Sequence, residues 1–179
     1  MDKAHALRRL LLQLSGMLPA RLMSRETRMQ HIFEKMKRDI AADGFFVMAV
    51  MASESRNTFA YTIGLSESTG HPELLMFGLP LQVAHLVLHD LARLIKAGAR
   101  YNDGDVVSEI LSVPMAMKSV RHEKASDYTV QLFNYYPDAE SPPPVMQVVL
   151  PDTRGKFPWA EDFDDKYKGM QPSLWNVIH

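Results

Sequence analysis

Residues Phe59–Pro80, with the sequence FAYTIGLSESTGHPELLMFGLP, decide the fold of this chain. Two short apolar runs, Phe59–Leu65 and Glu73–Leu79, flank a polar segment centred on His71. Apolar runs of this length, bounded by glycine and proline, are typical of strands that are buried on at least one face. The pattern therefore predicts two neighbouring strands joined by a polar loop.

Apolar patterns elsewhere predict the remaining elements. Further strands are expected over residues 45–52, 105–112, 115–121 and 145–150, and helices over residues 24–43, 80–97 and 126–136. The strands cluster and do not alternate with helices, and the short connection Ser53–Asn57 favours an antiparallel hairpin. We expect a single α+β domain over residues 24–179, with a mainly antiparallel sheet of five to six strands and helices packed on one face.

The segment before residue 24 has the pattern of an amphipathic helix. Five leucines share one helical face: Leu7, Leu10, Leu11, Leu14 and Leu18. Arg8 and Arg9 project away from that face. We interpret residues 1–23 as a helical arm. One alternative is a self-associating or membrane-surface regulator that acts through Leu7–Leu18, and the other is an arm that packs on its own domain.

Composition excludes several classes of protein. A chain of 179 residues with a formal net charge of −1 has no global charge that would favour nucleic acid. The absence of cysteine excludes disulfides, a thiolate nucleophile and Cys-ligated metal. No apolar run approaches the roughly 20 residues that span a bilayer, so we expect no integral membrane protein. No Walker loop, G-x-S-x-G motif or Rossmann glycine fingerprint is present, and we predict no cofactor.

Candidate catalytic groups gather around the His71 segment. His71 and Glu73 form a histidine–carboxylate pair, and Tyr61 and Thr62 lie on the preceding predicted strand. Such groups can perform acid–base chemistry on an unknown substrate. The structural alternative is that His71 only caps the turn and that Tyr61 is half-buried with its hydroxyl at the rim. Both alternatives stay open at this point.

A second informative stretch is QVVLPDTRGKFPW, which runs from Gln147 to Trp159. Asp152 can cap its own turn, and the aromatic side chains that follow can cover a sheet edge or line a groove. We expect a binding groove between the His71 loop and the Asp152–Trp159 turn. Its ligand-binding candidates are Tyr61, Thr62, His71, Gln147, Asp152 and Trp159.

His85 and His89 are four residues apart on the predicted helix over residues 80–97. This spacing places two imidazoles on one face, as many metal sites require. The helical wheel puts both outside the apolar arc, and the intervening glutamate of a metalloprotease helix is missing. We therefore predict no metal and keep the pair as weak candidates.

The motifs together resemble a known family. YTIGL, HPEL, FGL and VMQVVLPDxxGKFPW, in this order and spacing over Ser24–Trp175, resemble the bacterial domain-of-unknown-function 4262 family. The resemblance implies a small cytoplasmic bacterial protein, and it brings no reaction, cofactor or catalytic residue. We interpret the chain first as a module that binds a small molecule or a protein partner. The alternatives are an enzyme that uses His71, Glu73 and Tyr61, and a regulator that acts through the N-terminal helix.

Overall fold

The computed structural model describes residues 24–53, 57–136 and 143–175. The predicted arm, with its Leu7–Leu18 stripe, lies outside these residues, so its role in self-association or at a membrane stays a prediction. The chain divides into two compact units, Met1–Ala42 and Asp43–His179. The predicted domain boundary at residue 24 also stays a prediction.

Helix α2 (Arg25–Asp43) begins one residue after the predicted start and ends at the predicted residue. The Thr27 amide donates to the Ser24 hydroxyl at 3.1 Å, which satisfies one of the free amides of the first helical turn. Gly44 follows the helix with φ +80°, a left-handed conformation that glycine adopts without steric cost. Local capping chemistry therefore sets both ends of α2.

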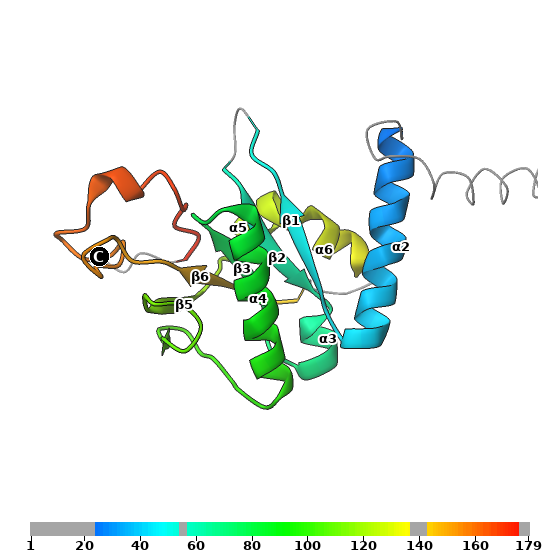
Figure 1. The fold of residues 1–179 in the computed structure, drawn as a ribbon, viewed down its shortest axis with the longest axis horizontal. Coiled ribbons are helices and arrows are strands. Elements are labelled where there is room, and N and C mark those ends of the chain that lie inside the picture. The colour runs from blue at the N-terminus through cyan, green and yellow to red at the C-terminus, as the bar shows by residue number, and fades with distance from the viewer. Residues whose placement is uncertain (1–23, 54–56, 137–142, 176–179) are drawn as a thin grey trace, which may run out of the picture. The chain divides into compact units, whose positions relative to one another are not determined.

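Six strands form one mixed sheet in the order β1-β2-β3-β6-β5-β4 (Figure 1). Their bounds are β1 Phe46–Val50, β2 Phe59–Ile63, β3 Glu73–Phe77, β4 Val106–Val107, β5 Met115–Ser119 and β6 Val145–Val149. Neighbouring strands are antiparallel except for β3 and β6, which are parallel and pair Glu73 with Val145. The predicted α+β class and mainly antiparallel sheet are confirmed.

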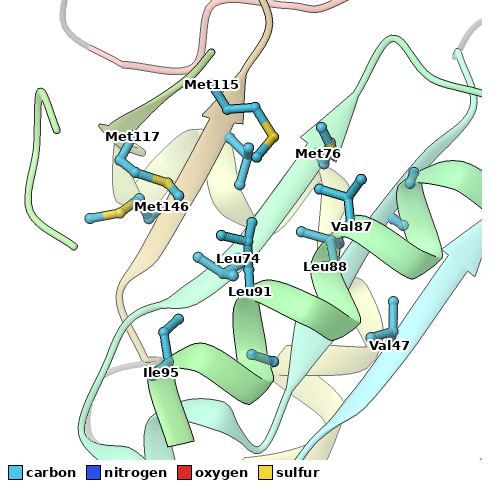
Figure 2. Close-up of a cluster of buried hydrophobic side chains, with 14 of the residues drawn as sticks. Val47, Leu74, Met76, Val87, Leu88, Leu91, Ile95, Met115, Met117 and Met146 are labelled. Atoms are coloured by element: carbon cyan, nitrogen blue, oxygen red, sulfur yellow. The ribbon is translucent and has the colours of Figure 1, made fainter. Parts of the chain in front are cut away.

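Helix α4 (Leu81–Lys96) packs on one face of the sheet. Figure 2 shows Leu74 and Met76 of β3 beneath Leu88 and Leu91 of α4, with the methionines of β5 and β6 beside them. Alternate strand residues point into this core, as expected for a strand that is covered on both faces. The apolar core between α4 and the sheet thus anchors the fold.

Helices α5 (His122–Tyr128) and α6 (Val130–Tyr135) pack behind the sheet, on the face opposite α4 (Figure 1). The Phe59 and Phe77 rings make T-shaped contacts with Tyr128 at 5.6 Å and 5.1 Å between centroids. These residues alternate along β2 and β3 with the ones that face α4. The prediction that the helices pack on one face of the sheet was therefore wrong in this detail. The aromatic side chains on the second face are also apolar, and α5 and α6 shield them from solvent.

A five-residue helix, α3 (Leu65–Thr69), replaces most of the predicted polar loop between β2 and β3. Gly64 and Gly70 flank it with φ +92° and +72°, so each end of α3 turns through a left-handed residue. The α3 turn places its free amides beside the start of β3, where the candidate groups lie.

No helix among the described residues is long and apolar enough to cross a bilayer.

Candidate functional site

Glu73 is completely buried at the start of β3. Its Oε2 accepts a hydrogen bond from the Thr62 hydroxyl at 2.6 Å, and its Oε1 accepts one from the Ser66 amide at 3.0 Å. The Thr62 hydroxyl in turn accepts from the Leu74 amide at 2.8 Å. The Thr62 hydroxyl therefore takes the place of a backbone carbonyl as acceptor between β2 and β3. The Glu73 carboxylate accepts from a free amide in the first turn of α3.

Burial raises the pKa of Glu73 from 4.5 to about 7, although hydrogen bonds from Thr62 and the α3 amides oppose the shift. No Lys or Arg of the described residues forms a salt bridge with this carboxylate. Burial without a countercharge is what makes ionisation unfavourable. Glu73 is thus a buried acid that titrates near neutrality and performs a structural role.

His71 is also buried, and both of its ring nitrogens are engaged. Nδ1 donates to the Pro72 carbonyl at 2.8 Å, and Nε2 accepts from the Tyr101 amide at 3.3 Å. These partners define the neutral tautomer that carries its proton on Nδ1. Burial, with a contribution from the Arg100 charge, lowers the pKa of His71. The ring joins the start of β3 to the segment after α4.

Tyr61 lies fully buried on β2, and its hydroxyl donates to the Gln131 side chain on α6. Burial raises the pKa of this hydroxyl well above its ordinary range. His71, Glu73 and Tyr61 therefore each bind a different structural partner. No hydrogen bond joins any two of these three side chains, and the enzyme hypothesis built on them stays a prediction.

The predicted groove between the His71 loop and the Asp152–Trp159 turn is not formed. His71 precedes β3, whereas Asp152 follows β6, and the two strands run parallel with Glu73 opposite Val145. The four steps from Val145 to Val149 alone span about 13 Å at about 3.3 Å per residue. The two segments consequently lie at opposite ends of the strand pair, and the expectation that they are neighbours was wrong.

The Asp152 turn is a preorganised unit at the end of β6. The buried carboxylate accepts from the amides of Arg154 at 2.8 Å, Lys156 at 2.9 Å and Asp164 at 3.1 Å. Burial raises the pKa of Asp152, but these hydrogen bonds outweigh it and hold the pKa at about 2. Asp152 therefore stays ionised and organises the loop.

Trp159 stands on this turn with 46% of its surface exposed. Its ring stacks on Phe157 at 4.9 Å between centroids with a 10° interplanar angle, and it meets the edge of Trp175 at 5.8 Å. The Lys118 ammonium lies 5.0 Å from its centroid. We name Phe157, Trp159 and Lys118 the Trp159 platform. In this platform the exposed Trp159 ring is contacted by Phe157 and Lys118, and also by Trp175.

Gln147 lies completely buried on β6 and contacts the chain's own C-terminal segment, with Nε2 donating to the Pro172 carbonyl at 2.9 Å. Of the predicted ligand-binding residues, only Trp159 is exposed. Sequence reasoning missed Lys118, Gln171 and Trp175. The alternation along β5 could have indicated Lys118, whereas nothing in the sequence links the Gln171 region to β6.

His85 and His89 stack at 6.3 Å between centroids, and His89 also meets the edge of Phe45 at 5.3 Å. Across the part of the chain that the structure describes, no group of three or more His, Asp or Glu side chains could hold a metal ion. The pair thus has no third ligand among these residues.

Two of the hollows on the surface of the described residues have a volume of about 370 Å³ each. One is lined by Asn57, Thr58, Gly78, Leu79, Pro80, Gly169 and Met170, and the other by Ala49, Leu81, Gln82, His85 and Leu86. Neither contains any of the residues predicted to bind a ligand. The hollows therefore lend no support to the predicted groove.

Comparison with known proteins gives one match. A family model described as a domain of unknown function, DUF4262, matches residues 39–164, which is well over half of the chain. No curated protein and no solved structure matches. The match includes the His71 segment and the whole Trp159 turn, and it ends before the Gln171–Trp175 segment. The chain belongs to the DUF4262 family.

Proposed function

We propose that this protein is a binding module whose contact surface is the Trp159 platform. The observation that carries the proposal is the combination of exposure and order at Trp159, which is 46% exposed yet held by Phe157, Trp175 and Lys118. Tryptophan is enriched among the residues that dominate binding energy at interfaces. Because the ring is already ordered, a partner would immobilise few rotamers on contact.

The chemistry of the turn supports the same interpretation. The carboxylate of Asp152 accepts hydrogen bonds from three backbone amides, so the loop that presents Trp159 is held by hydrogen bonds within the chain. Lys118 contributes a cation at the ring, and Asp103 pairs with it at 3.6 Å. The result is a rigid aromatic contact point with a polar rim, which is the common organisation of a protein interface. The cytoplasmic bacterial setting implied by the family resemblance is part of this proposal.

Site-specific photo-crosslinking in the intact chain tests the proposal. A benzophenone amino acid at position 161, which leaves Trp159 in place, is compared with the same residue at position 130, since Glu161 and Val130 are both exposed. We expect position 161 to yield a defined crosslinked partner that position 130 does not. Lys118→Ala should reduce the yield of that product. Identical products from both positions, or none from position 161, would contradict the proposal.

A further inference from the structure

The C-terminal segment Gln171–Trp175, which we name the strap, lies against the β5–β6 part of the sheet. Leu174 is 2% exposed and Trp175 is 7% exposed. The Trp175 ring packs in a cluster with Ala116 of β5 and Val149 of β6. We name the surface formed by Ala116, Gln147 and Val149 the strap face. Two large side chains thus anchor the strap in apolar surroundings.

The protein binds the strap mainly through the strap's backbone. The Gln147 amide donates to the Pro172 carbonyl at 2.9 Å, and its oxygen accepts from the Leu174 amide at 3.3 Å. The Arg121 amide donates to the Leu174 carbonyl at 3.0 Å. Backbone hydrogen bonds that give affinity, together with pockets that select side chains, are the usual means of recognising an extended peptide.

A second glutamine completes the attachment from the opposite side. Gln171 of the strap accepts from the Leu150 amide at 3.0 Å and donates to the Leu150 carbonyl at 2.7 Å. Each glutamine therefore satisfies one donor and one acceptor of the other segment's backbone. With the strap in place Gln147 is completely buried, and both ends of its side-chain amide bind strap backbone atoms. The strap face has the features of a built peptide site.

We propose that the strap face also binds, in trans, an extended protein segment of the same chemistry as the strap, with a glutamine followed three and four residues later by leucine and tryptophan. The chain's own strap is the resident ligand of this site. Residues 151–170 connect the strap to β6, and a connection of that length gives an effective concentration of the order of millimolar. An external segment competes with that resident strap. This inference does not rest on the proposed role of the Trp159 platform.

The test uses the full chain and a fluorescein-labelled peptide with the sequence of residues 169–175. Trp175→Ala weakens the resident strap and leaves the strap face intact. We expect saturable binding to this variant, at least about tenfold tighter than to the wild-type chain, because the competing strap is weaker. Adding Gln147→Met, which removes both amide contacts at similar side-chain volume, should reduce the affinity at least about tenfold. A scrambled peptide is the matched control.

Circular dichroism and cooperative unfolding establish that each variant is folded, and Leu174→Ala replaces Trp175→Ala if the latter does not fold. Absence of saturable binding up to about 1 mM peptide, with the variant folded, would overturn the proposal. Equal binding with and without Gln147 would also overturn it, because the peptide would then be held by apolar contact alone. Loss of the crosslink at position 161 has no bearing on this result.

Discussion

Replacing Glu73 with glutamine should raise the stability of the protein relative to the wild type as the pH rises to neutral and alkaline values. The wild-type carboxylate has a pKa of about 7 in the folded chain, against 4.5 as its ordinary value. Between these two values the folded chain holds a proton that the unfolded chain has released. The folded chain therefore loses stability as the pH rises through this window, and it does not recover that stability above pH 7.

The expected magnitude follows from the size of the pKa shift. A shift from 4.5 to about 7 corresponds to about 3 kcal/mol, at 1.36 kcal/mol per pKa unit. The glutamine side chain keeps an oxygen to accept from the Ser66 amide and carries no charge at any pH, but its amide nitrogen cannot accept from the Thr62 hydroxyl, which adds a cost that does not depend on pH. The stability of the variant relative to the wild type should thus rise by about 3 kcal/mol between pH 4.5 and pH 8.

Urea unfolding of both chains at pH 5, 6, 7 and 8 measures this difference directly. Subtracting the two curves removes the contribution of every other titrating group. Glu67→Gln is the matched control, because Glu67 is an exposed carboxylate on α3 close to Glu73 in sequence. A stability difference that stays constant from pH 5 to pH 8 would refute the reasoning, as would an equal gain in the control.

Three further predictions concern other parts of the molecule. The pKa of His71 is lowered in the folded chain, so the wild type should lose stability as the pH falls below about 6.5. Urea unfolding of His71→Gln should not show that loss, and parallel plots of stability against pH for the two chains would contradict the prediction. Gly44→Ala should lower the free energy of unfolding by about 2 kcal/mol, because the new Cβ would lie 3.0 Å from the Cβ of Ser68. Gly155→Ala has a similar φ but no atom near the new Cβ, so urea unfolding should show a loss of only about 1 kcal/mol. Trp175→Ala should lower the free energy of unfolding by about 3 kcal/mol and Trp159→Ala by about 1 kcal/mol, and equal losses would show that both rings are equally buried.

The sequence predicted most of the architecture because its strands and long helices have strong local patterns. The alternation and apolar runs located β1, β2, β3, β5 and β6 within a few residues, and the capping residues located α2 and α4. Helix α3 was missed because its five residues, LSEST between two glycines, are too few to show a helical periodicity. The first expected strand after α4, over residues 105–112, contracted to Val106–Val107, because much of that segment is exposed.

The candidate site was predicted less well, because it depends on contacts between distant segments. Sequence reasoning selected His71, Glu73, Gln147 and Asp152 as catalytic or ligand-binding candidates, whereas the structure buries each of them and engages it in hydrogen bonds within the chain. What it could not foresee was the parallel pairing of β3 with β6, which separates the two predicted halves of the groove. Strand order and register are non-local properties, and no residue type in either strand specifies its neighbour.

The central position of β6 has a consequence for how the chain folds. β6 is the last strand in sequence, yet it lies between β3 and β5 in the sheet. Until residues 145–149 are in place, β1–β3 and β4–β5 remain two separate ladders that share no hydrogen-bonded edge. Formation of the β3–β6 pair closes a loop of about 70 residues, and such high contact order slows folding. During synthesis the edge of β3 that later pairs with β6 therefore remains unpaired. This exposed edge is where aggregation of the nascent chain, or its capture by a chaperone, would begin.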